Sequence, residues 1–226
     1  MSPGKKPRVK KPPPPPTPKA PRPWDVPPYP IRGDAQAETT YAAVGHALSC
    51  WEIFERILSL IFASIVGGRE DNLPALRAYG AIATFRGRAE MIGAAAEAYF
   101  AAYPNPGGEE LIKKLLSDAI NFSNRRNEIA HGFVNGWRPE DAPPSDAGWV
   151  SMPFHYSPRK SKFDRSKVAP QSMPVRPALR HAYLYSSKEI NAFRAQFEAL
   201  TQHALSLSTA IRVLRNPAEE AARARR

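Results

Sequence analysis

The distribution of proline decides which parts of this sequence can form long helices. Thirteen of the first 30 residues are proline, including an unbroken run over residues 12–16. Proline has no backbone N–H to donate and a fixed φ angle, so residues 1–33 are predicted to be an extended, disordered, basic tail. The long proline-free stretches lie farther along the chain. Helices of many turns can form only there.

Four of these stretches carry apolar residues at the three- and four-residue spacing of a buried helix face. A Gly-Gly pair ends the first, Pro74 marks the first turn of the second, and Gly132 is placed as the residue that stops the third. Ser186 and Glu189 form a capping-box pattern where the fourth begins. The predicted helices cover residues 37–66, 74–103, 109–131 and 186–214.

The fourth predicted helix has the most regular apolar stripe in the chain. It therefore needs a helical partner, either within the chain or in a second copy. The predicted fold class is mainly α, a four-helix bundle in one domain over residues 34–216, followed by a basic C-terminal tail over 217–226. The stripe consists of Ile190, Phe193, Phe197, Leu200, Ala204, Leu207, Ile211 and Leu214.

Residues 133–185 interrupt the helical pattern between the third and fourth helices. They contain two β-favouring runs, WVSMPFHY at 149–156 and HAYLY at 181–185, separated by a basic loop. The pattern predicts a β-containing insertion in which these runs form a hairpin. Its aromatic residues either make a small core for the hairpin or offer a surface on which single-stranded bases stack. They are Trp137, Trp149, Phe154, Tyr156, Tyr183 and Tyr185.

The formal net charge of +11 is unevenly distributed along the sequence. Residues 1–30 and residues 151–185 each carry a net charge of +6, and the rest of the chain is close to neutral. Two basic segments on a neutral body indicate a polyanionic partner whose affinity falls as salt rises. The simpler interpretation is a solubilising tail and a solvated loop.

Several other classes of protein are disfavoured by the sequence. The longest apolar run, residues 57–66, is about half the length that crosses a bilayer, so no membrane partner is expected. The single Cys50 permits no intrachain disulfide and favours a reducing compartment, so we expect a cytoplasmic protein. We expect no metal site and no cofactor, because no ligand spacing for a metal and no phosphate-binding glycine loop is present.

The third predicted helix places an arginine in its apolar stripe. Arg126 follows Phe122 and precedes Ile129 on the same face, where an apolar residue belongs. A buried guanidinium needs an acid, a path to solvent or an anionic ligand. Asn127 and His131 lie one turn apart on a neighbouring polar stripe. An arginine and an imidazole in one cleft are the minimum for metal-free phosphodiester cleavage, since one neutralises charge and the other moves a proton.

Residues 126–131, RNEIAH, resemble the signature of the HEPN (higher eukaryotes and prokaryotes nucleotide-binding) superfamily. That signature is an arginine, four to six residues and a histidine, commonly with Asn, Asp or His after the arginine. Arg125 also satisfies the looser spacing. The resemblance implies a short helical bundle that acts as a metal-independent endoribonuclease in toxin or defence systems.

The resemblance also implies roles for individual residues and for partners. Arg126 and His131 would act at the scissile phosphate, Asn127 would position the histidine, and the RNA 2′-hydroxyl would be the nucleophile. RNA would be the substrate, two copies of the motif would face one cleft in a homodimer, and a cognate antitoxin protein would be a further partner.

A second hypothesis keeps the helices but not the catalysis. In it the protein is a non-catalytic HEPN-like module that binds nucleic acid or acts as a scaffold. Arg126 would then pair with an acid of the first helix, Glu52 or Glu55, and His131 would only cap its own helix. Those acids fit both hypotheses, because active sites also use carboxylates to orient an arginine.

Overall fold

The computed structural model describes residues 20–67, 72–139, 142–154, 161–163 and 179–223. The predicted tail up to residue 19 and most of the basic loop before residue 179 lie outside them. The described chain is mainly α-helical, as predicted, and none of its helices is long and apolar enough to cross a membrane. In chain order its elements are α1 (Ala37–Gly67), α2 (Leu73–Ala81), α3 (Phe85–Ala102), α4 (Pro106–His131), β1 (Gly132–Trp137), the 3-10 turn η1 (Pro144–Asp146), β2 (Gly148–Pro153), β3 (Ser161–Phe163), β4 (Leu179–His181) and α5 (Ser187–Arg223).

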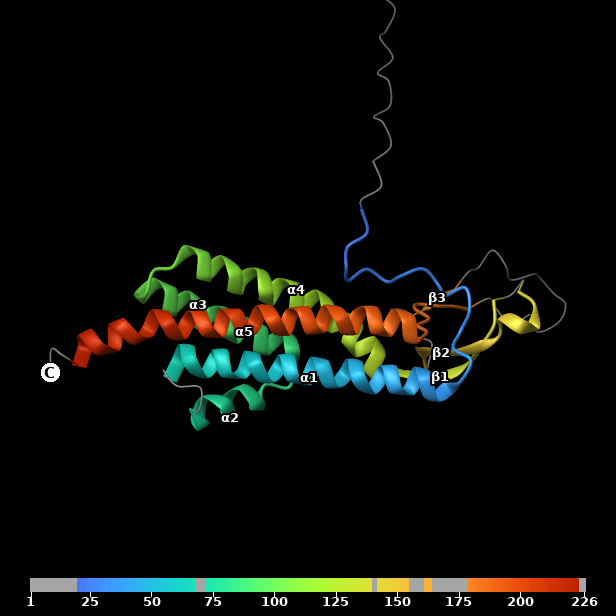
Figure 1. Ribbon diagram of the computed structural model, residues 1–226, viewed down its shortest axis with the longest axis horizontal. Coiled ribbons are helices and arrows are strands. Elements are labelled where there is room, and N and C mark those ends of the chain that lie inside the picture. Colours follow the sequence, from blue (N-terminus) through green and yellow to red (C-terminus); the bar gives the residue numbers. More distant parts are fainter. Residues whose placement is uncertain (1–19, 68–71, 140–141, 155–160, 164–178, 224–226) are drawn as a thin grey trace, which may run out of the picture.

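The two longest helices, α1 and α5, run side by side through the middle of the molecule, and both begin at the end that carries the β strands (Figure 1). The apolar stripe of α5 therefore finds its helical partner within the chain. Trp51 of α1 is fully buried and makes edge-to-face contacts with Phe54, Phe85 and Phe197. Helices α3 and α4 pack against each other and contribute buried residues to the same core.

The prediction of one helix over residues 74–103 is wrong. Helix α2 ends with Ile82 in an extended conformation, and Thr84 caps the N-terminus of α3 by accepting a hydrogen bond from the Gly87 N–H at 3.1 Å. No proline lies at the break, and the nearby Gly80 lies inside α2, so the apolar periodicity did not reveal where α2 ends. The local signal was the threonine, whose side chain favours an N-cap over a helix interior.

The predicted hairpin also has a different partner. Strand β2, which overlaps the run 149–156, pairs antiparallel with β1 rather than with residues 181–185. The run 181–185 contributes a single bridge, between Ser151 and Tyr185, and its first residue belongs to β4, which pairs with β3. Three stretches of the insertion, residues 140–141, 155–160 and 164–178, lie outside the described residues.

Gly132 ends α4 for a different reason from the one predicted. Its φ of −75° and ψ of 154° are extended, not left-handed, so it leads directly into β1. A Cβ atom there would lie 2.3 Å from the Ser151 hydroxyl oxygen and 3.0 Å from the Glu128 carbonyl oxygen. Glycine is needed because the β2 strand approaches α4 closely at this point.

The structure differs from the prediction near both boundaries of the predicted domain, residues 34 and 216. Residues 20–33, assigned to the disordered tail, pack on the bundle: the Trp24 ring lies edge-on against Phe122 with centroids 5.8 Å apart, and the Tyr29 hydroxyl donates to the His181 carbonyl. At the other end α5 continues to Arg223, past residue 216, and includes Pro217.

Asp34 ties the starts of α1 and α5 to the hairpin. Its carboxylate accepts hydrogen bonds from the Thr40 hydroxyl at 2.6 Å and from the backbone N–H and hydroxyl of Ser187 at 2.8 and 2.7 Å. Its backbone N–H and carbonyl pair with Trp149 of β2, each at 2.8 Å. At the start of α5, Ser186 and Glu189 form the predicted capping box, with Glu189 accepting from the Ser186 backbone N–H at 2.9 Å.

Replacing Asp34 by alanine should lower the free energy of unfolding by about 2 kcal/mol, because three donors lose a charged acceptor. Urea unfolding followed by circular dichroism measures the loss. The matched control is Asp118→Ala, which removes an exposed ion pair with Lys114 within one helix and should cost less than about 0.5 kcal/mol. Equal losses for the two variants would show that Asp34 does not connect the helix starts.

Candidate functional site

A cavity of about 410 Å³ lies between α1, the start of α3 and the end of α4. Polar and charged groups make up most of its wall, and each of the three helices contributes some of them. Arg126, Asn127 and His131 all line it, so the structure brings together the three residues singled out from the sequence. The lining residues are Trp51, Glu52, Glu55, Ala83, Thr84, Phe85, Arg88, Ser123, Arg126, Asn127 and His131.

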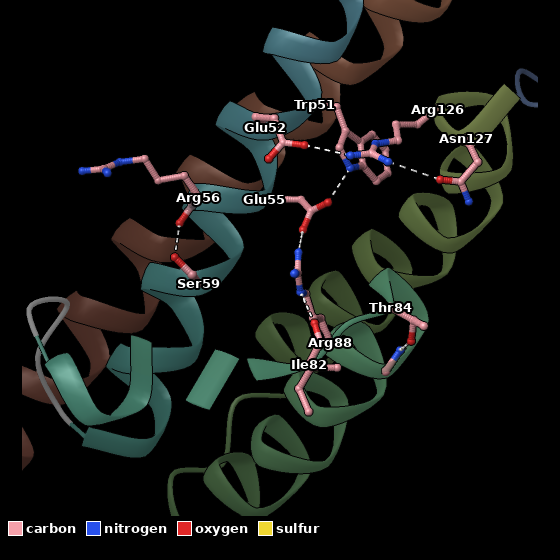
Figure 2. A network of polar contacts seen from close by, with 11 residues as sticks. Trp51, Glu52, Glu55, Arg56, Ser59, Ile82, Thr84, Arg88, Arg126 and Asn127 are labelled. Atoms are coloured by element: carbon pink, nitrogen blue, oxygen red, sulfur yellow. Dashed lines mark hydrogen bonds and ion pairs between the residues drawn. The ribbon is translucent and has the colours of Figure 1, made fainter. Parts of the chain in front are cut away.

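Arg126 pairs with an acid on α1, which is one of the possibilities that the sequence left open for an arginine in this stripe. Its Nη2 lies 2.9 Å from Glu52 Oε1, and its Nη1 donates to Asn127 Oδ1 at 3.4 Å (Figure 2). The pair is accessible to solvent, since the Arg126 side chain is 28% exposed and that of Glu52 is 62% exposed. Of the two candidate acids it is therefore Glu52, not Glu55, that meets Arg126.

The adjacent arginine, Arg125, points into a different environment. Its Nη1 lies 2.8 Å from Glu128 Oε2 and donates to the Tyr185 hydroxyl at 3.2 Å, and its side chain is only 11% exposed. The Tyr185 hydroxyl in turn donates to Glu128 at 2.5 Å. Burial and the nearby Glu128 charge raise the pKa of Tyr185, so this hydroxyl stays protonated as a donor. Arg125 belongs to a packed network, whereas Arg126 belongs to the cavity.

Asn127 and His131 stand on the exposed side of the last turns of α4. His131 is the final residue of the helix, and both side chains are open to solvent. In the described part of the chain, the hydrogen bond of Asn127 is made with Arg126 and not with His131. An imidazole and a guanidinium that line one cavity supply a group that can move a proton and a group that can stabilise an anion.

Sequence reasoning missed Arg88, the second arginine of the cavity. Arg88 of α3 forms an ion pair with the buried Glu55, and its Nε donates to the Ile82 carbonyl at 2.9 Å. Glu55 also accepts a hydrogen bond from the Trp51 indole N–H at 2.7 Å. The available signal was Glu55, which lies four residues after Trp51 on the buried face of α1 and so needed a cation. The sequence around Glu55 does not identify that cation, because Arg88 lies 33 residues away.

The aromatic residues of the insertion separate into two groups. Tyr183 and Tyr185 are fully buried, stack on each other with centroids 4.8 Å apart and belong to the core of the helical bundle. Trp137 instead packs against a small separate core of Val150, Met152 and Leu184. Phe154 is 73% exposed and packs edge-on against Phe133. Trp149 is partly exposed. Tyr156 lies outside the described residues.

Within the described residues, no group of three or more His, Cys, Asp or Glu side chains gathers closely enough to hold a metal ion. Comparison with known proteins gives no guide to function, since no family model, no characterised protein and no solved structure matches the chain. The chemistry of the cavity residues is therefore the basis on which a function can be inferred.

The two neighbouring arginines should respond differently to mutation. Arg125→Met should lower the free energy of unfolding by about 3 kcal/mol, because Glu128 would keep a half-buried charge without its cation. Arg126→Met should cost less than about 1 kcal/mol, since it breaks a solvent-exposed pair. Urea unfolding of the two variants measures the difference. Similar losses would mean that Arg126 is as structural as Arg125.

Arg88→Met should lower the free energy of unfolding by about 3 kcal/mol, because it leaves the Glu55 carboxylate buried with the Trp51 indole as its remaining partner. Adding Glu55→Gln should recover part of that loss by removing the buried charge. Thermal or urea unfolding of the single and double variants tests this coupling. If the double variant is no more stable than Arg88→Met, the ion pair is not what holds the α2–α3 break against α1.

Proposed function

We propose that the protein is a metal-independent endoribonuclease of HEPN type that acts at the cavity between α1, α3 and α4. The observation that carries the proposal is that Arg126, Asn127 and His131 line one solvent-open cavity, while the neighbouring Arg125 is packed into a separate network. The resemblance of residues 126–131 to the HEPN signature supplies the reaction class, and the cavity offers the groups that this reaction uses.

The reaction needs a base, an acid and a group that stabilises charge on the phosphate. The RNA 2′-oxygen attacks the adjacent phosphorus, a P–O2′ bond forms and the P–O5′ bond breaks. The 2′-hydroxyl loses its proton and the leaving 5′-oxygen gains one, with His131 carrying protons at the rim of the cavity. Arg126 neutralises the charge that develops on the phosphate oxygens. The products are a 2′,3′-cyclic phosphate and a 5′-hydroxyl end.

The biological setting belongs to the same proposal. By analogy with the family that the motif resembles, we infer a cytoplasmic toxin or defence protein that acts on RNA. A homodimer would place two such cavities on one RNA, and a cognate antitoxin protein would restrain the activity. These inferences follow from family analogy, since a fold by itself does not determine function.

One observation favours the second candidate, a non-catalytic module that binds nucleic acid or acts as a scaffold. The ion pair with Glu52 satisfies part of the Arg126 guanidinium without any ligand, as a structural pair would. The two candidates differ in whether the RNA backbone is cut, since the second one binds nucleic acid or a partner without cleaving it.

The deciding experiment is cleavage of a mixed single-stranded RNA pool by the purified full chain in EDTA. Wild type should cut and leave cyclic phosphate ends. Arg126→Ala and His131→Ala should each lower the rate by about 100-fold or more, because each removes a group that acts in the transition state. Gel analysis of the fragments and of their ends provides the readout.

Two variants control for nonspecific loss of charge or imidazole. Arg56→Ala removes an exposed arginine of α1 that points away from the cavity (Figure 2). His203→Ala removes an exposed histidine of α5. Both should cut like wild type, and circular dichroism should show every variant folded. Binding of RNA by a folded wild type that never cuts it would favour the second candidate. Full activity in His131→Ala would overturn the proposed mechanism.

A further inference from the structure

The cavity contains two carboxylates with different surroundings. Glu55 is buried and fully engaged, with the Trp51 indole on one oxygen and Arg88 on the other. Glu52 stands one turn away at the mouth, where its side chain is 62% exposed. In the described part of the chain, its one ion pair is with Arg126 (Figure 2). The fold therefore depends on Glu55 and has little need of Glu52.

Arg126 is incompletely satisfied by its protein partners. Nη2 holds Glu52 at 2.9 Å, but the contact from Nη1 to Asn127 is long, at 3.4 Å. Its Nε is buried and has no hydrogen-bond acceptor among the described residues. A guanidinium binds phosphate best with two donors on two oxygens, so a phosphodiester would use the donor that Glu52 now occupies.

We propose that Glu52 sets the affinity of the cavity for RNA by competing with the substrate phosphate for Arg126. This inference rests on the proposed function, because it names the group that regulates entry to the same site. A carboxylate and a phosphodiester are both anions, so the two cannot share Arg126 without repulsion. The carboxylate turns toward solvent when the phosphate arrives. Its exposure makes that displacement cheap, since exposed ion pairs are weak.

The opposite role, in which Glu52 orients Arg126 for catalysis, predicts the opposite result. An orienting carboxylate would be needed in the transition state, and its removal would lower kcat. A competing carboxylate weakens ground-state binding, and its removal would lower KM while kcat stays close to that of wild type. The direction of the change upon removing one charge therefore separates the two roles.

The test measures binding of a short single-stranded 2′-O-methyl RNA, which has no free 2′-hydroxyl and cannot be cut. Fluorescence anisotropy compares wild type, Glu52→Gln, Arg126→Ala and the double variant, all as full chains. Glu52→Gln keeps the shape of the side chain and removes its charge. It should lower Kd by about fivefold. Binding to wild type must first break the exposed pair of Glu52 with Arg126, and an exposed pair near the upper end of its usual strength corresponds to a factor of that size. The slope of log Kd against log salt should stay close to that of wild type, because Arg126 contacts the phosphate in both complexes once Glu52 has turned away.

The double variant and a charge control test whether the effect passes through Arg126. Glu52→Gln in the Arg126→Ala background should give no gain in affinity. Glu38→Gln removes an exposed charge from the first turn of the same helix, outside the cavity, and should change Kd by less than about twofold. A gain in the double variant equal to that of Glu52→Gln alone would overturn the proposal, because a general charge effect would then explain it.

Two further outcomes would also overturn it: unchanged or weaker binding by Glu52→Gln, or a fall in kcat with KM unchanged. Failure to bind by both wild type and Glu52→Gln counts against it as well, because releasing Arg126 should create a measurable site. Failure of the proposed function has a different signature. If wild type never cuts unmodified RNA but Glu52→Gln binds more tightly through Arg126, the nuclease proposal falls and the competition stands.

Discussion

The buried indole of Trp51 explains why a buried carboxylate and its arginine partner stand in the wall of the cavity. Its ring fills the centre of the core between α1, α3 and α5, and its N–H needs an acceptor there. Glu55, one turn later, supplies that acceptor and so places a carboxylate in the core. A buried carboxylate requires a cation, which Arg88 provides from α3. Because Arg88 also binds the Ile82 carbonyl, the same contact holds the α2–α3 break beside α1, and this break forms one wall of the cavity.

Helical geometry assigns different roles to two identical neighbours in the chain. Successive residues of an α-helix point about 100° apart. Arg125 is thereby directed to Glu128 and Tyr185, which join α4 to the segment before α5, while Arg126 is directed to α1. A motif defined by spacing cannot separate these two residues, but their burial and partners do.

The cavity is balanced in charge although the chain as a whole is strongly basic. Two glutamates face two arginines in its wall, and the excess positive charge lies in residues 1–30 and 151–185 of the sequence. For an RNA substrate as proposed above, this distribution would separate two tasks. The basic segments would attract the polyanion over a distance of about 10 Å at moderate salt, whereas the cavity would discriminate at contact.

The sequence by itself determined the features that depend on neighbours in the chain. These are the mainly helical content, most of the helix ends, the capping box before α5 and the anomaly of Arg126 in an apolar stripe, because helix periodicity and caps act within a few residues. Tertiary structure alone decided the features that depend on distant contacts. Strand β1 pairs with β2, residues 20–33 pack on the bundle, the second predicted helix breaks at residues 82–84, and Arg126 pairs with Glu52. Burial and charge pairing between segments distant in the chain settle these choices, and only the helix break left a local signal, the N-cap at Thr84.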